Sequence, residues 1–481
     1  MKAETPLNIL FLVGEDNGFH LGACGDRYAH TPQLDALADE GYFFPNTYAT
    51  SPVCAPSRCT YASGRYAYSL GAHNMRSELS KPPRVFTEEL RDQGYHVSWQ
   101  GKTDFNFQPS GSFADDREPW LDRLAEGELP QPFLLYRNFG VTHESGMWPK
   151  PFNGQGSCDQ RIAQQDKLRE APLPAAGEIE PPPYLPDHPE VRADLERFYQ
   201  TLYLQDLEVA EIVEALHKSP YADNTILVYV ADHGRGLPRE KRWCYPAGVR
   251  VPLILWGKPL TQIADALDPD QLVSGVDIAP TLLDLAGVAI PDNYEGNSLL
   301  GNKTCEYVFG GRDRMDEVFD RVRYANDGRY HYIHNDFPQL PYASRLTFME
   351  RQKTTQVLRK LHRNGQLSEA AALWMAAEKP EEELYDLESD PCCVANLAQD
   401  PGNSEFLHRM RKALGEHQRE VVDLAQRRET QLVSEGVLEA SILGGYASRV
   451  AELTEEDRFE PSPAPMLEEH LGETTSALDG I

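Results

Sequence analysis

Short runs of β-branched and aromatic residues recur along the N-terminal half of the chain, each followed by a longer segment with room for a helix. The runs cover residues 9–13, 96–99, 133–139, 226–230 and 252–256. Because they are largely apolar, we expect both faces of these strands to be buried. Strands that alternate with helical segments predict an α/β fold, with a mostly parallel sheet between layers of helices.

Two segments between these runs carry helix signals. Residues 31–41 open with Thr-Pro, end with Gly and place Leu34 and Leu37 on one face. Residues 193–217 have an apolar stripe at mixed three- and four-residue spacing. Both helices are expected to pack on the sheet.

Residues 158–189 are polar and proline-rich and cannot sustain a helix or a central strand, so we interpret them as a loop over a site.

The pattern changes after residue 300. Strand-like pieces at 307–309, 330–333 and 384–387 accompany helical runs near 348–362 and 405–427. After Ala451 the chain has nine acidic residues, one arginine and three prolines, a composition typical of a tail that is solvated or laid on another subunit. The predicted organisation is a large α/β domain over 1–304, a smaller α+β domain over 305–450 and an acidic tail over 451–481.

Composition and charge narrow the possible partners. The net charge of −29 comes from 46 basic and 75 acidic residues, and 41% of the chain is hydrophobic. This excludes a wholly disordered chain and disfavours nonspecific nucleic-acid binding. The run at 9–13 is far shorter than the ~20 residues that cross a bilayer. We therefore expect no membrane segment.

Cysteine usage and the N-terminus bear on location. The eight cysteines are scattered, without the spacing of a disulfide scaffold or a zinc ribbon. No signal-type cleavage context follows the first apolar run. We therefore expect a cytoplasmic protein in a reducing compartment; the alternative is a periplasmic protein whose sequence here lacks its signal peptide.

Two pairs of residues that can bind metal follow predicted strands. Glu15 and Asp16 follow the run at 9–13, and Asp232 and His233 follow the run at 226–230. Ligands bind at the carboxyl ends of strands in open α/β sheets, so the two pairs together suggest a site for a hard divalent cation. Taken alone, an aspartate after a strand is more often a turn or N-cap residue.

A cysteine motif points to a particular chemistry. Cys54-Ala-Pro-Ser-Arg58 is followed by Ser63-Gly-Arg65, and residues 57–63 could open a helix whose positive end faces the cysteine, a favourable place for an anion. This arrangement resembles the type I sulfatases. Their Cys-x-Pro-Ser-Arg motif, followed by Thr/Ser-Gly-Arg, directs oxidation of the cysteine to formylglycine, which makes a formylglycine-generating enzyme an expected partner.

The resemblance covers roughly residues 8 to 400 and implies an alkaline-phosphatase-like fold. Its further segments are 8–16, 31–35, 277–285, 383–390 and 396–397. Within the family the chain is most similar to the heparan N-sulfatase, or sulfamidase, branch. The segments that carry this likeness are 15–19, 138–143, 184–187, 191–195 and 331–343.

The resemblance implies a mechanism. A hydrated aldehyde made from Cys54 would attack sulfur and form a covalent sulfate ester, and the second hydroxyl would then expel sulfate as the aldehyde re-forms. One divalent cation, Ca²⁺ by preference with Mg²⁺ or Mn²⁺ as alternatives, would be held by five residues: Glu15, Asp16, Cys54, Asp232 and His233.

The same resemblance assigns roles to basic residues. Arg58 would support the hydrated aldehyde, Lys102 and Lys241 would pair with sulfate oxygens, and His143 would face the leaving group or the sulfate. Arg242 could replace Lys241. Without the motif, each of Lys102, Lys241 and His143 would more often be a solvated surface group.

Three positions depart from the family pattern. Glu15 stands where Asp is usual, Asp232 is followed by His233 instead of Asn, and Asp104 replaces the histidine of a Gly-Lys-x-His element. The combination Asp232-His233 resembles the related arylsulfatase and phosphonate monoester hydrolase branches, so a phosphonate monoester or phosphodiester hydrolase is the alternative enzyme. A noncatalytic anion-binding homologue is the third reading, which the intact modification motif disfavours.

The substrate and the assembly are predicted from charge and composition. A chain of −29 would repel long sulfated polysaccharides, so we expect a small sulfated molecule or a short sulfated oligosaccharide carrying a sulfate ester or sulfamate. Four tryptophans are candidate sugar-stacking surfaces, although tryptophan more often lies in the core: Trp99, Trp120, Trp148 and Trp243. Scattered apolar residues in the tail suggest a homodimer or a higher even oligomer.

Overall fold

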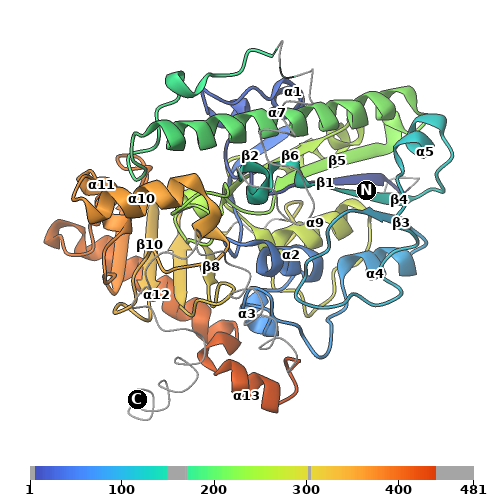
Figure 1. The fold of residues 1–481 in the computed structure, drawn as a ribbon. Helices are drawn as coiled ribbons and strands as arrows, with labels where there is room; N and C mark the ends of the chain where they lie inside the picture. Colours follow the sequence, from blue (N-terminus) through green and yellow to red (C-terminus); the bar gives the residue numbers. More distant parts are fainter. Residues whose placement is uncertain (1–5, 149–167, 169–170, 302–304, 440–481) are drawn as a thin grey trace.

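A seven-stranded sheet organises the larger part of the molecule (Figure 1). The computed structural model describes residues 6–148, 168, 171–301 and 305–439. The strand order is β3-β4-β1-β5-β6-β2-β7, and β6 alone runs antiparallel to its neighbours. The strands are β1 (Asn8–Gly14), β2 (Tyr42–Tyr48), β3 (His96–Gln100), β4 (Phe133–Phe139), β5 (Thr225–Ala231), β6 (Arg250–Trp256) and β7 (Val273–Ser274). The predicted mostly parallel sheet is confirmed.

Helices cover both faces of this sheet, as the apolar runs predict (Figure 1). Ile9, Phe11 and Val13 of β1 face one core, and Leu10 and Leu12 face the other. One layer holds α1 (Pro32–Glu40), α5 (Leu121–Glu126) and α7 (Pro189–Lys218), and the other holds α2 (Cys54–Ser63), α4 (Phe86–Asp92) and α9 (Ile278–Leu285). Two one-turn helices, α3 (Ala67–Leu70) and α8 (Pro246–Val249), lie in connections between these elements.

The start of α1 differs from its sequence signal. Thr31 makes no capping bond with its side chain. Instead, the buried Asp206 of α7 accepts hydrogen bonds from the backbone N–H groups of Gln33 (3.0 Å) and Leu34 (2.8 Å). A carboxylate from a neighbouring helix therefore satisfies donors that a helix leaves unpaired at its N-terminus.

A smaller antiparallel sheet follows, in the order β11-β10-β9-β8. Its strands are β8 (Val308–Arg312), β9 (Val322–Asn326), β10 (Tyr330–Asn335) and β11 (Glu382–Asp386), and its helices are α10 (Lys353–Arg363), α11 (Glu369–Trp374), α12 (Ser404–Glu420) and α13 (Glu429–Ser434). Met410 and Leu414 of α12 cover one face. The other face joins the core of the larger unit through residues such as Tyr324 and Ile333.

Direct hydrogen bonds also join the two sheets. Tyr324 Oη donates to the carbonyl of Ala49 (2.7 Å), and His331 Nε2 donates to the carbonyl of Cys244 (2.6 Å). The segments that they reach, before α2 and before α8, flank the site described below. The smaller sheet therefore supports the loops of the larger one.

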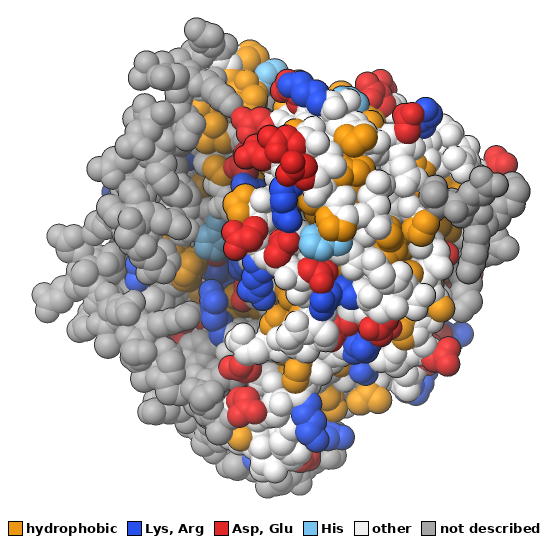
Figure 2. Space-filling model, turned by 90° about the vertical axis from the view of Figure 1, so that its right-hand side faces the viewer, with side chains coloured by type: hydrophobic (Ala, Val, Ile, Leu, Met, Phe, Trp, Pro, Cys, Tyr) orange, Lys and Arg blue, Asp and Glu red, His pale blue; other side chains and the backbone are white. Residues whose placement is uncertain are grey.

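The surface carries side chains of both charges. On the face in Figure 2, acidic and basic side chains are interspersed among the described residues. No helix in the described ranges is long and apolar enough to cross a membrane.

The four tryptophans considered as sugar-stacking surfaces are only 1–3% exposed and therefore belong to the core: Trp99, Trp120, Trp148 and Trp243. The predicted tail over 451–481 and much of the predicted loop over 158–189 lie outside the described residues.

Candidate active site

Four adjacent parallel strands deliver charged residues to one edge of the large sheet. In the order β3-β4-β1-β5, the segments after these strands carry Lys102, His143, Asp16 and Asp232. Strands β1 and β5 are in register up to Gly14 and Ala231, so the residue pairs that follow them, Glu15-Asp16 and Asp232-His233, meet. The Asp16 N–H donates to Asp232 Oδ1 over 2.9 Å. The adjacent ends of these parallel strands therefore bring the predicted residues together.

Cys54 is the first residue of α2 and is 1% exposed. Its Sγ lies 3.2 Å from His233 Nε2 and 3.7 Å from Asp16 Oδ1. One ligand atom from each of Asp16, Cys54, Asp232 and His233 lies within 4.8 Å of the others. The helix begins at Cys54 instead of Ser57, so position 54 occupies the positive end of the helix itself.

The donor set fits a divalent cation. Asp16 and Asp232 are fully buried, an arrangement that favours a cation between their carboxylates. His233 donates Nδ1–H to the carbonyl of Gly234 over 2.9 Å, which leaves Nε2 with a lone pair facing the same space. Burial lowers the pKa of His233 despite Asp232 and Asp16, which favours the neutral, metal-binding form.

Glu15 occupies a different place from the other predicted metal ligands. It does not belong to the group of four. Its Oε1 lies 2.5 Å from Lys102 Nζ, and its Oε2 accepts a hydrogen bond from Asn138 over 3.0 Å. Burial would raise the pKa of Glu15, but Lys102, His143 and Arg58 outweigh it and hold that pKa well below its usual range. Glu15 as a metal ligand stays a prediction.

Arg58 is anchored directly behind the cluster. Its Nε and Nη2 donate to Asp232 Oδ2 over 3.1 and 2.7 Å, and its Nη1 donates to Tyr136 Oη over 2.9 Å. Arg58 is 2% exposed and lies about one turn after Cys54 in the same helix. It therefore supplies a fixed positive charge beside the cysteine.

The two lysines each bridge two carboxylates. Lys241 Nζ lies 2.7 Å from both Asp16 Oδ2 and Glu144 Oε1, and the residue is 1% exposed. Lys102 Nζ contacts Glu15 and lies 3.1 Å from Asp104 Oδ2, with a side chain 27% exposed. Consecutive acidic residues after β1 are therefore each paired with a different lysine.

Glu144 is a buried member of the site that the sequence analysis missed. Arg242 donates two hydrogen bonds to its carboxylate, over 2.7 and 3.0 Å, and the Glu144 N–H donates to Asp16 Oδ2 over 2.8 Å. Burial would raise the pKa of Glu144, but Arg242 and Lys241 lower it to about 2. The signal that could have revealed it is its place beside His143 in the segment after β4.

His143 lies near Asp16 and Glu144, within the same 4.8 Å limit. Its Nδ1 is 2.8 Å from Ser145 Oγ, and its ring meets Phe348 edge-on at 6.1 Å between centroids. Burial lowers the pKa of His143, an effect that Lys241 adds to and Asp16 opposes. The imidazole is therefore neutral near neutral pH and can hold or accept one proton.

Comparison with known proteins decides the family. The family model described as Sulfatase matches residues 7–288. An ulvan-active sulfatase from Formosa agariphila is 34% identical over 474 aligned residues, which cover 90% of this chain and 78% of that protein. The chain belongs to the sulfatase family. It is a hydrolase of sulfuric esters, and proteins of this family generally use a formylglycine and a divalent cation.

Two further comparisons place this sulfatase among its relatives. N-sulphoglucosamine sulphohydrolase from Homo sapiens is 24% identical over 469 residues, covering 87% of this chain and 91% of that protein, which is consistent with the predicted sulfamidase-like branch. A protein solved in complex with its substrate D-glucosamine-2-N,6-O-disulfate matches with a TM-score of 0.59 at 18% identity. The match covers 88% of the present chain and 100% of that protein's chain. That likeness shows a common fold.

Proposed function

We propose that this sulfatase releases inorganic sulfate from a small sulfated sugar or a short sulfated oligosaccharide, with a nucleophile made from Cys54. The observation that carries the proposal is the position of Cys54 at the first turn of α2, against Asp16 and His233 and in front of Arg58. The precursor of the nucleophile, the buried candidate metal ligands and the positive charge of Arg58 therefore lie close together.

The thiol itself is poorly suited to attack. Burial raises the pKa of Cys54 to about 12, against the lowering effect of Lys102 and Lys241. A protonated thiol is a weak nucleophile at neutral pH. Oxidation by a formylglycine-generating enzyme, whose motif the chain carries, would replace it with an aldehyde that hydrates to a hydroxyl nucleophile.

A divalent cation would be held by Asp16, Asp232 and His233 together with an oxygen on position 54. We propose Ca²⁺, because two of these protein donors are carboxylates, with Mg²⁺ or Mn²⁺ as alternatives. When bound, the cation supplies charge that lowers the pKa of the nucleophile and neutralises sulfate oxygens.

The basic residues of the site have separate roles in binding and proton transfer. Arg58, held by Asp232 and Tyr136, stabilises oxygens on position 54. Lys241 and Lys102 bind the oxygens of the sulfate, where negative charge grows during S–O or S–N cleavage. His143 is placed to exchange a proton with the leaving group because its imidazole is neutral.

The proposed substrate class rests on relatives and on charge. The names of the two curated relatives refer to ulvan and to sulphoglucosamine, and the solved relative binds a glucosamine disulfate. All three names indicate sugars. The net charge of −29 favours a short ligand over a long polyanion.

One experiment tests the chemistry. The mass of the peptide containing Cys54 should fall by the difference between CH2–SH and CHO, and sulfate should appear when sulfated monosaccharides are supplied. His233 favours a second candidate, a phosphonate monoester or phosphodiester hydrolase. Its products would be phosphonate or phosphate, so anion chromatography on matched sulfate and phosphonate esters separates the two.

We further propose that the chain forms a homodimer or a higher even oligomer. The proposal rests on the apolar residues spaced through the acidic segment after Ala451, which include Phe459 and Leu467. A proline-containing segment of this kind can gain order by lying on a second copy of the chain.

A further inference from the structure

The charged groups around Cys54 differ in how far solvent reaches them. Asp16, Asp232, Glu144 and Lys241 are at most 1% exposed. Three other side chains are partly open: Arg76 at 34%, Lys102 at 27% and Asp104 at 18%. Solvent therefore reaches this charged network at these three side chains, which we call the rim.

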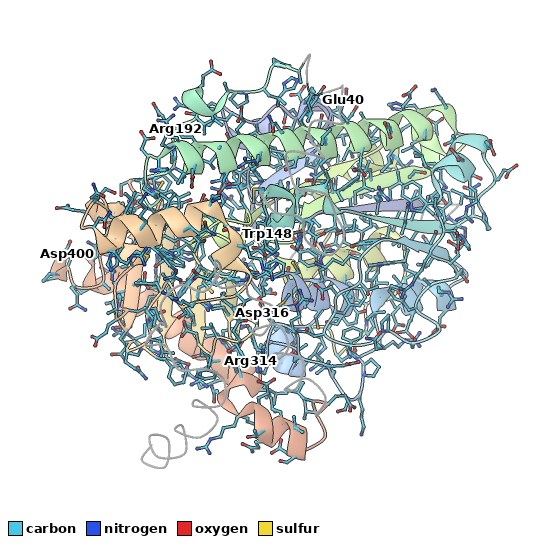
Figure 3. All side chains as sticks on the ribbon, in the orientation of Figure 1. Glu40, Trp148, Arg192, Arg314, Asp316 and Asp400 are labelled. Carbon is cyan, nitrogen blue, oxygen red and sulfur yellow. The ribbon has the colours of Figure 1, made fainter. Side chains whose placement is uncertain are left out.

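Ion pairs connect the rim to the buried groups. Lys102 links Asp104 to Glu15, and Arg76 Nε lies 3.4 Å from Asp316 Oδ1. Asp316 Oδ2 in turn lies 4.0 Å from Arg242 Nε. Figure 3 places Asp316 near the centre of the molecule, between the ribbons of the larger and smaller sheets. The rim is thus assembled from both parts of the chain.

Backbone strain is concentrated in this arrangement. Among the described residues, eight that are not glycine have positive φ, and five of them belong to the site or its rim: Asp16, Arg76, Asp104, Arg242 and Asp316. A left-handed non-glycine residue is strained and persists where the surroundings require its geometry. The placement of Asp104 and Arg76 is therefore imposed by tertiary contacts.

Asp104 has hydrogen-bonding capacity to spare. Its Oδ2 lies 3.1 Å from Lys102 Nζ. Within the described ranges, that oxygen is buried and has no hydrogen-bond partner. The pKa of Asp104 is lowered by Lys102 and Arg76 against the effect of burial, so the group is a carboxylate. A carboxylate repels sulfate oxygens and accepts O–H donors, so its natural partner is a hydroxyl on the organic part of the substrate.

We propose that Asp104 is a specificity-determining residue that accepts a hydrogen bond from a hydroxyl group of the sugar bearing the sulfate. The inference rests on the proposed function and identifies the part of the substrate that the rim recognises.

The test compares two kinds of substrate on one enzyme. The sugar probes are D-glucosamine N-sulfate and D-glucosamine 6-sulfate, and the probe without hydroxyls is 4-nitrophenyl sulfate. In Asp104→Asn, the ratio of kcat/KM for the better sugar sulfate to that for the aryl sulfate should fall about 10- to 100-fold, as expected for loss of a hydrogen bond to a charged acceptor. Any effect of the substitution on Lys102 changes sulfate binding in both kinds of substrate and therefore cancels in the ratio. The ratio thus reports recognition of the sugar alone.

Matched variants sharpen the comparison. Asparagine tolerates the left-handed backbone at position 104, so Asp104→Asn should fold. Asp104→Glu keeps the charge but displaces it and should also lower the ratio, with thermal denaturation as the check that this variant is folded. Asp115→Asn removes a partly exposed carboxylate that pairs with Arg91 and should leave the ratio unchanged. A deoxy sugar sulfate lacking the contacted hydroxyl should show no further loss in Asp104→Asn.

Each outcome decides between the claims. An unchanged ratio in Asp104→Asn and Asp104→Glu would overturn the role of Asp104 and leave the sulfatase assignment in place. Turnover of the aryl sulfate without turnover of either sugar sulfate would also overturn the inference. Absence of sulfate release from all three probes by the formylglycine-bearing protein would instead refute the proposed function.

Discussion

Cys54 has a small buried side chain whose polar neighbours are His233 and Asp16. Replacing it by alanine removes one heavy atom from the core but the whole of the proposed nucleophile. We expect Cys54→Ala to abolish sulfate release while the melting temperature changes little. Sulfate assays and thermal denaturation of the same preparation test this. Turnover at the normal rate would refute the proposed chemistry.

Glu144 compensates two buried cations, Lys241 and Arg242. Removing one partner of a buried ion pair leaves an uncompensated charge and costs about 3–5 kcal/mol. Glu144→Gln should therefore lower stability by about that amount and also reduce kcat, because Lys241 loses one of the two groups that orient it. Denaturant unfolding and steady-state kinetics measure the two effects. As a control, Glu214→Gln removes the exposed partner of Lys218 and should change neither.

The residues of the site differ in how well the sequence predicts them. Asp16, Asp232 and His233 follow strands, and the Cys54 motif is continuous in sequence, so topology alone brings them together. Glu144 and Asp316 stand outside any motif, and their loops meet the site only through tertiary packing. The pairing of Glu15 with Lys102 likewise depends on side-chain geometry that strand order does not specify.

Helix α1 depends on a carboxylate from α7, and this dependence should vary with pH. Burial raises the pKa of Asp206 to about 6, although its two backbone hydrogen bonds act in the opposite direction. The folded chain then binds more protons than the unfolded chain between pH ~4 and ~6, so its stability falls as pH rises through that window. The stability advantage of the wild type over Asp206→Asn should shrink by about 2–3 kcal/mol across it. Equilibrium unfolding at several pH values checks this; a constant difference would contradict it.

Strands were more predictable than their directions. The run at 133–139 is a strand with those bounds, and the neighbouring runs end within two residues of the strands observed. The antiparallel direction of β6 leaves no trace in hydrophobic periodicity. Strand β2 was missed because Pro45 interrupts it, and there the register with β6 shifts between Phe44 and Thr47. Strand β9, in the smaller sheet, was also missed.

We expect the candidate ligand set to make the stability and the activity of the whole molecule depend on metal. Chelation should eliminate activity, and Ca²⁺ should restore it. Because the cation binds the folded state, adding Ca²⁺ to chelator-treated protein should also raise its melting temperature. Asp16→Asn should abolish that stabilisation, since it removes a charged ligand oxygen. A metal-free protein with full activity and an unchanged melting temperature would refute the prediction.

The segment after Ala451 is predicted to contribute to assembly. A chain ending at Ala451 should shift toward the monomer mass in light scattering if that segment contacts another subunit. Retention of both the oligomeric mass and the activity in the shortened chain would show that the segment is an appendage.

The two sheets share one hydrophobic core, in which Leu10 and Leu12 of β1 belong to the same cluster as Tyr324 and Ile333 of the smaller sheet. Such a core transmits the loss of either part to the other, so cooperativity extends across the boundary proposed near residue 304. Calorimetry should therefore record the unfolding of both sheets in a single endotherm. For the same reason, a fragment ending at residue 304 would expose apolar surface and lose the support of its catalytic loops, so dividing this chain in two is expected to yield neither a stable scaffold nor an enzyme.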